Sequence, residues 1–216
     1  MTLKGILFDL DGTLIDSIPL ITASDKAAIN KFGFKVSHQK MRELSQLHSR
    51  DIAYYLMDTF NESFDVHDFV NYRRDVFVNL LKKQKNLWFK DSKDFIKLAS
   101  ENHKIGLVTG SRWKFLEEIL DEETKKELDF IVTSDDVEHK KPDIEPLEKT
   151  LKKLKLERDE IVFIGDSTQD ALMCQRYCVP YIAKTTGIST IHQLKEFNPI
   201  ALAKNFEQIV EELELE

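Results

Sequence analysis

The alternation of short apolar runs with amphipathic stretches of helical length is the feature that most restricts the fold of this chain. Five apolar runs have the length and composition of strands, and they cover residues 3–8, 104–109, 130–133, 160–164 and 181–183. Stretches with helical spacing lie between them, including residues 92–99, 145–154 and 170–178. Strands that alternate with helices are typical of parallel sheets, so we predict an α/β fold built on a doubly wound parallel sheet.

A helical insertion interrupts this alternation. The segment between the first and second predicted strands is far longer than one crossover helix needs, and residues 18–84 show helical patterns only. Helix starts are indicated at four positions, Pro19, Ser37, Ser49 and Asp65. We therefore predict an α/β core domain of residues 1–16 and 87–216 and an inserted α-helical cap domain of residues 17–86.

Charge and composition exclude several classes of partner. The chain has 216 residues with 31 Lys and Arg against 38 Asp and Glu, a net charge of -7, which argues against a protein that must neutralise the phosphates of a nucleic acid. No apolar run approaches membrane-spanning length, and the N-terminus does not resemble a signal peptide. Cys174 and Cys178 lie four residues apart in a helical pattern, which suits two reduced thiols. We expect a cytoplasmic monomer or weak homodimer without nucleic-acid or membrane partners.

Two aspartates stand where the first predicted strand ends, in the sequence Phe8-Asp9-Leu10-Asp11-Gly12-Thr13. Residues two apart on an extended strand point to the same side, so Asp9 and Asp11 are expected to bring two carboxylates into one small volume. Two anions this close repel each other unless a cation or a proton is shared between them. A hard divalent cation with oxygen ligands, most naturally Mg²⁺, is therefore expected here.

The second predicted strand ends in Thr109-Gly110-Ser111. Thr109 and Ser111 supply hydroxyl groups, and the glycine turn into the next helix supplies backbone N–H groups. Hydroxyls beside a turn of this kind are suited to binding a phosphate. We predict that these three residues bind an anionic substrate.

Charged residues also follow the third and fourth predicted strands. After the third comes Lys141, next to Pro142, which stiffens the chain and aims the ammonium group as a point charge. After the fourth come Asp166, at a strand-to-helix turn, and Asp170, one helical turn later. The carboxyl ends of parallel strands share one edge of the sheet, where ligands bind, so all these side chains are predicted to form one site.

This set of side chains matches the demands of phosphoryl transfer. That reaction needs positioning and charge neutralisation more than elaborate covalent chemistry. An aspartate is ionised at neutral pH and forms an acyl phosphate without a base to activate it, if a metal ion and a lysine suppress its repulsion from the substrate. One aspartate of the first pair is expected to attack phosphorus, and the other to protonate the leaving alkoxide and then activate water.

The chain resembles the phosphatases of the haloacid dehalogenase superfamily, in the branch (subfamily I) that carries a helical C1 cap and includes phosphoglycolate phosphatases and β-phosphoglucomutases. The four motifs of that family match, in order, Phe8-Asp9-Leu10-Asp11-Gly12-Thr13-Leu14, Thr109, Lys141-Pro142, and Gly165-Asp166-Ser167 with Asp170. The resemblance covers essentially the whole chain. It implies a haloacid dehalogenase-like Rossmannoid core and a phosphoaspartate intermediate.

The resemblance also implies individual roles. Asp9 would be the nucleophile and Asp11 the general acid and base. Mg²⁺ would bind the side chain of Asp9, the backbone carbonyl of Asp11 and the side chain of Asp166, with Asp170 as a secondary carboxylate that acts through water or through Lys141. Thr109 and Lys141 complete the predicted catalytic set.

A possible substrate contact lies in the predicted cap domain. Relatives that act on sugar phosphates carry a Ser-Arg pair in a cap loop, and Ser49-Arg50 is similar in placement, so Arg50 is the candidate for the distal group of the substrate. The position where phosphomutases of the family hold a histidine corresponds to Ile21, which counts against mutase activity. The predicted function is a Mg²⁺-dependent phosphatase acting on a small phosphorylated metabolite. The alternatives are a phosphomutase of the β-phosphoglucomutase type and a catalytically silent phosphate-binding protein.

Overall fold

The protein contains two compact units in a computed structural model that describes residues 2–215. The core unit consists of Met1–Asp16 and Trp88–Glu216, and the helical unit consists of Ser17–Leu87. The helical unit ends at Leu87, one residue after the predicted end of the cap domain at residue 86. Trp88 belongs to the core unit because it forms a β-bridge with Ile15, and the N–H of the next residue, Phe89, donates to the carbonyl of Leu14 at 3.0 Å.

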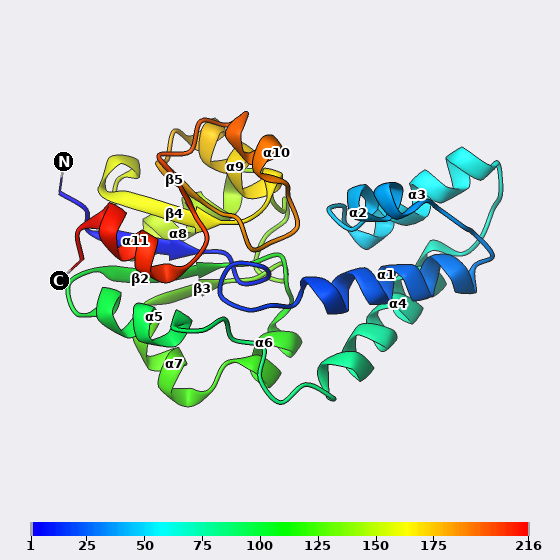
Figure 1. Ribbon diagram of the computed structural model, residues 1–216, viewed down its shortest axis with the longest axis horizontal. Coiled ribbons are helices and arrows are strands. Elements are labelled where there is room, and N and C mark those ends of the chain that lie inside the picture. The colour runs from blue at the N-terminus through cyan, green and yellow to red at the C-terminus, as the bar shows by residue number, and fades with distance from the viewer. Residues whose placement is uncertain (1, 216) are drawn as a thin grey trace. The chain divides into compact units, whose positions relative to one another are not determined.

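A six-stranded parallel sheet forms the centre of the core unit (Figure 1). Its strands are β1 (Gly5–Phe8), β2 (Lys104–Val108), β3 (Phe130–Val132), β4 (Ile161–Gly165), β5 (Tyr181–Lys184) and β6 (Ala201–Ala203). The spatial order is β3-β2-β1-β4-β5-β6, and all neighbours are parallel. The predicted doubly wound sheet is confirmed. The sixth strand was not predicted, because its sequence Ala-Leu-Ala lacks the β-branched and aromatic residues typical of strands.

The register of the central strands explains where a site can form. Phe8 of β1 aligns with Leu107 of β2 and with Ile164 of β4. The chain moves outward from β1 through β2 to β3 and then returns to β4 on the other side of β1, so the strand order reverses between β1 and β4. Open α/β sheets bind ligands beyond the carboxyl ends of the strands at such a reversal.

Seven α-helices and one short 3₁₀ helix of the core unit surround the sheet. They are α5 (Ser92–Ser100), α6 (Trp113–Ile119), α7 (Glu122–Glu127), α8 (Glu145–Leu154), the 3₁₀ helix Arg158–Glu160, α9 (Thr168–Tyr177), α10 (Ile191–Lys195) and α11 (Phe206–Leu213). On one face, Leu7 and Phe163 share a buried apolar cluster with residues of α8 and α9. On the other, Phe8 contacts Phe95 of α5, which contacts Phe206 of α11, with ring centroids 5.7 and 5.0 Å apart. Strands β1, β4 and β5 are thus buried on both faces, as their near-continuous apolar sequences require.

The helical unit is built from α1 (Ile18–Lys31), α2 (His38–Leu44), α3 (Ser49–Phe60) and α4 (Val66–Leu81). The predicted starts at Ser37 and Asp65 are confirmed, since the Ser37 hydroxyl accepts from the N–H of Lys40 and the Asp65 carboxylate accepts from two N–H groups of α4. The predicted start at Ser49 is confirmed as well, because α3 begins at that residue. Within the described part of the chain, no helix is long and apolar enough to cross a membrane.

Candidate active site

Lys141 joins two aspartates at the carboxyl edge of the sheet. Asp9 directly follows β1, and its side chain is almost fully buried. Lys141, which lies between β3 and α8 and is also buried, donates from Nζ to Asp9 Oδ1 at 2.6 Å and to Asp170 Oδ1 at 2.7 Å. Three residues that are far apart in sequence therefore meet, as predicted. The Nζ also lies 5.2 Å from the centroid of the Phe163 ring, which favours a cation.

Asp170 is fixed by the start of the helix that carries it. It is the third residue of α9, and it forms a capping box with Ser167, whose Oγ donates to Asp170 Oδ2 at 2.5 Å. The N–H of Ser167 donates to the same oxygen at 3.2 Å. With Lys141 on Oδ1, both oxygens of this carboxylate are engaged by the protein. Asp170 is thus placed to orient Lys141.

Asp166 is held by contacts to both of its carboxylate oxygens. It follows β4 and is 1% exposed. Thr13 Oγ1 donates to Asp166 Oδ1 at 3.1 Å, and the N–H of Ile188 donates to Oδ2 at 2.8 Å. The sequence analysis did not assign a role to Thr13 or Ile188. Thr13 could have been found from its place two residues after the second aspartate, but nothing in the sequence marks Ile188.

The acidic cluster holds more negative than positive charge. Asp9, Asp166 and Asp170 each offer an oxygen within 4.8 Å of the others, and the ammonium group of Lys141 contacts Asp9 and Asp170. Burial raises the pKa of Asp9 well above its usual value, against the lowering effect of Lys141, and burial together with Asp170 raises the pKa of Asp166 to about 7. Burial lowers the pKa of Lys141, but the charges of Asp170 and Asp9 outweigh it and raise that pKa above its ordinary value.

These carboxylates fit a divalent cation. Three buried oxygen donors with an uncompensated negative charge provide the ligand chemistry and the field that a hard cation requires. Asp9 and Asp166 would hold it most directly, because the Asp166 oxygens accept from the neutral donors Thr13 and Ile188, whereas Asp170 is bound to the ammonium group of Lys141 and to Ser167. The carboxylate of Asp11 lies outside this cluster, which is compatible with the backbone contact that the resemblance implies for it.

Asp11 forms the second part of the site. Its side chain is half-buried, and its Oδ2 accepts from Ser111 Oγ at 2.7 Å. Thr109 is buried, and its Oγ1 accepts from the N–H of Ser111 at 3.0 Å. The ends of β1 and β2 therefore meet as predicted. The amide of Ser111 is used inside the turn, so it is less available to an anion than expected.

Two backbone N–H groups of the rim have no partner. The N–H of Leu10, between the two aspartates, and the N–H of Gly110 make no hydrogen bond to any residue in the described range 2–215. Gly110 is exposed, and a Cβ there would meet nothing within 4 Å. Free N–H groups beside a lysine are suited to phosphate oxygens. The contribution of the Leu10 N–H group was not predicted, because the residue type does not indicate what a backbone group binds.

Arg50 belongs to the helical unit. It is exposed in the first turn of α3, where His48 caps the helix without a side-chain hydrogen bond. Its predicted contact with substrate stays a prediction.

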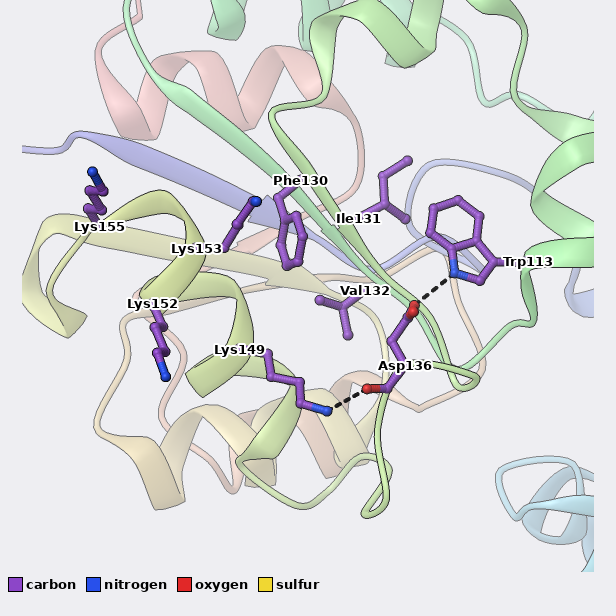
Figure 2. A pocket seen from close by; sticks show the side chains of 9 residues that line it. All are labelled: Trp113, Phe130, Ile131, Val132, Asp136, Lys149, Lys152, Lys153 and Lys155. Atoms are coloured by element: carbon purple, nitrogen blue, oxygen red, sulfur yellow. Dashed lines mark hydrogen bonds between the residues drawn. The ribbon is translucent and has the colours of Figure 1, made fainter.

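A lysine-rimmed groove lies outside the acidic cluster. It has a volume of about 680 Å³; β3 forms its floor, and Lys149, Lys152, Lys153 and Lys155 stand along its rim, as Figure 2 shows. These lysines are exposed, which is typical of a solvated helix face.

Comparison with known families agrees with this geometry. Residues 6–184, which include every predicted site residue, match the family described as haloacid dehalogenase-like hydrolase. The chain belongs to the haloacid dehalogenase-like hydrolases. The predicted family, the fold class and the classification as an enzyme are confirmed.

Several relatives of this hydrolase are phosphatases by name. A pyrophosphatase PpaX of Oceanobacillus iheyensis is 24% identical over 97% of this chain and 96% of its own length. A phosphoglycolate phosphatase of Photorhabdus laumondii is 26% identical over 96% of this chain and 91% of its own. Among solved structures, CbbY from Rhodobacter sphaeroides in complex with phosphate has a TM-score of 0.80 at 18% identity, covering 99% of this chain and 100% of that one. That likeness shows a shared fold.

Proposed function

We propose that this hydrolase is a Mg²⁺-dependent phosphatase that cleaves the phosphate monoester of a small metabolite through a phosphoaspartate at Asp9. The observation that carries the proposal is the buried contact of Lys141 with Asp9 and Asp170, beside Asp166, at the reversal of the strand order. A buried carboxylate fixed by a lysine is the arrangement that a nucleophile toward phosphorus needs. An ordinary structural ion pair would not require two further buried carboxylates.

The residues act in two steps. A carboxylate oxygen of Asp9 attacks phosphorus as the bond to the leaving oxygen breaks, and Asp11 gives its proton to that oxygen. Asp11 then takes a proton from the water that attacks the phosphoaspartate, which releases inorganic phosphate and restores both aspartates. Ser111 orients the Asp11 carboxyl through the hydrogen bond to Oδ2.

The reaction requires that all the positive groups of the site be present. Lys141 would neutralise part of the charge of the phosphoryl group, while the N–H groups of Leu10 and Gly110 and the hydroxyl of Thr109 would donate hydrogen bonds to its oxygens. Mg²⁺, held by Asp9 and Asp166 with the backbone carbonyl of Asp11, would supply the remaining positive charge. Because burial raises the pKa of Asp9, this carboxyl is a poor nucleophile until that charge is present.

The relatives indicate the size and charge of the substrate. Their names refer to pyrophosphate and to phosphoglycolate, both small and anionic, and CbbY has also been crystallised with xylulose-1,5-bisphosphate. We extend this substrate class to the present protein. The helical unit is proposed to act as the cap that excludes water and selects the substrate, with Arg50 meeting its distal group.

Hydrolysis of an aryl phosphate tests the proposal. The unmodified protein is expected to release phosphate in the presence of Mg²⁺ and to stop when the metal is chelated. Asp9→Asn should abolish turnover. Asp159→Asn, which changes an exposed aspartate, should leave the rate unchanged and serves as the matched control.

The products separate the alternatives. A panel of pyrophosphate, phosphoglycolate and sugar bisphosphates, followed by phosphate assay and by NMR of the organic product, distinguishes hydrolysis from isomerisation. Binding of phosphate without turnover of any member, with or without Mg²⁺, would contradict the proposal in favour of a silent binding protein. An isomer formed without free phosphate would contradict it in favour of a mutase.

A further inference from the structure

Lys184 is a buried lysine with no carboxylate partner. It ends β5, and its side chain is 1% exposed. Its Nζ lies 4.6 Å from the ring centroids of both Phe89 and Phe206, and among residues 2–215 no carboxylate is within ion-pair distance. Burial lowers the pKa of Lys184 to about 8, although the charge of Asp166 raises it. A buried ammonium group without a carboxylate partner lowers the stability of the folded protein, so packing alone does not explain its presence.

The ammonium group determines how the hydroxyl of Thr186 is oriented. Lys184 Nζ donates to Thr186 Oγ1 at 3.0 Å. An ammonium group only donates, so the hydroxyl must accept from it, and its single proton is left for another acceptor. That acceptor is the carbonyl of Gly12, 2.9 Å from Thr186 Oγ1. Lys184 therefore fixes a link between residue 186 and the turn that follows Asp11.

The chain around Thr186 also holds Asp166. We call residues 185–189 the support segment. Its Ile188 N–H donates to Asp166 Oδ2, and its Gly187 packs so closely that a Cβ there would lie 1.7 Å from the same oxygen. Asp166 Oδ1 is bound by Thr13, which belongs to the Gly12 turn. The Gly12 turn thus binds one oxygen of the Asp166 carboxylate, and the support segment binds the other.

We propose that Lys184 is a positioning residue of the acidic site: through Thr186 it ties the support segment to the Gly12 turn, and so fixes the Asp166 carboxylate in the orientation that binds the metal. The inference rests on the proposed function, because it requires Asp166 to be a metal ligand. Groups that orient metal ligands typically change metal affinity by about 10- to 100-fold when they are removed. Neither Lys184 nor Thr186 is expected to touch substrate.

Metal binding in the absence of substrate tests the inference. Mn²⁺ serves as the probe, because the free ion is measured directly by electron paramagnetic resonance. Lys184→Met keeps the length of the side chain and removes the donor, and Thr186→Val removes the hydroxyl and keeps the shape. Each is expected to weaken Mn²⁺ binding by about 10-fold. The matched control, Lys204→Met, changes an exposed lysine and should bind as the unmodified protein does.

The double variant distinguishes positioning from a general loss of stability. Because both side chains act through one hydrogen bond, Lys184→Met combined with Thr186→Val should bind Mn²⁺ no more weakly than either single variant. If Lys184→Met does not fold, Thr186→Val alone carries the test, since it leaves the lysine in place. Unchanged affinity in Thr186→Val, or tighter binding in a folded Lys184→Met, would overturn the inference.

Asp166→Asn separates this inference from the proposed function. If Asp166→Asn binds Mn²⁺ as tightly as the unmodified protein, the proposed metal site is wrong. If Asp166→Asn loses binding while the Lys184 and Thr186 variants keep it, the metal site stands and the inference about Lys184 fails.

Discussion

Replacing Asp166 by asparagine should stabilise the metal-free protein, by an amount that grows as the pH rises to about 7. The substitution keeps the shape of the side chain. Its Oδ1 can accept from the N–H of Ile188, and its amide can donate to Thr13 Oγ1, so both contacts of the carboxylate are replaced. The change therefore removes a buried charge and keeps a hydrogen bond to each of the two partners.

The magnitude follows from the raised pKa of Asp166. The value of about 7 is roughly three pH units above the ordinary 3.8, and each pH unit corresponds to about 1.4 kcal/mol. Between these two values the folded protein keeps a proton on Asp166 that the unfolded chain has lost, so the free energy of unfolding falls as the pH rises through this window. Above about pH 7 the loss reaches about 4 kcal/mol, which corresponds to roughly 10 °C in Tm for a chain of this size.

Thermal unfolding in the presence of chelator measures this effect. The Tm of Asp166→Asn is expected to exceed that of the unmodified protein at pH 8 by clearly more than at pH 5, where roughly a third of the loss has accumulated. Addition of Mg²⁺ at pH 8 should raise the Tm of the unmodified protein and leave the variant unchanged. Asp159→Asn, at an exposed position, should show neither effect. A Tm difference that does not depend on pH, or an unmodified protein that is more stable than the variant at pH 8, would refute the reasoning.

Three further predictions concern catalysis. Ser111→Ala should lower kcat by up to about 100-fold with little change in KM, because the Asp11 carboxyl loses its orienting hydrogen bond; an equal rise in KM would contradict this in steady-state kinetics with an aryl phosphate. Asp170→Asn should lower kcat by about 10- to 100-fold, since Lys141 loses one of its two carboxylate partners, and retention of the full rate would contradict the orienting role of Asp170. Arg50→Ala should raise KM for substrates with a second anionic group and barely affect KM for an aryl phosphate whose aryl group is neutral. An equal rise in KM for both would show that Arg50 does not contact the substrate.

Much of the core could be predicted because short stretches of sequence indicate its strands and the residues at their ends. Strands β1 to β5 are apolar apart from Lys104 at the start of β2 and Lys184 at the end of β5, and chemistry-bearing residues follow β1, β2 and β4 immediately. Once a parallel sheet is inferred, the shared carboxyl edge brings these residues together without further assumptions. The contacts of Lys141 with Asp9 and Asp170 follow from that logic.

The support of the site could not be predicted, because it depends on tertiary contacts between distant segments. Lys184 ends a strand and would ordinarily be expected to reach solvent, yet the rings of Phe89 and Phe206 enclose its ammonium group. Gly187 gives no sign in the sequence that it packs on Asp166. The strand β6 was missed for a different reason, since its sequence Ala-Leu-Ala has little strand propensity although it pairs with β5.

A covalent phosphoryl group on Asp9 is the central claim of this account, and chemical trapping during turnover tests it most directly. The protein is mixed with Mg²⁺ and an excess of substrate, quenched in acid and reduced with borohydride, which converts an acyl phosphate of aspartate to homoserine. Mass spectrometry of the peptide that contains residue 9 is expected to find homoserine there, only when substrate was present. Active turnover with an unreduced aspartate at position 9 and homoserine at another aspartate would contradict the account.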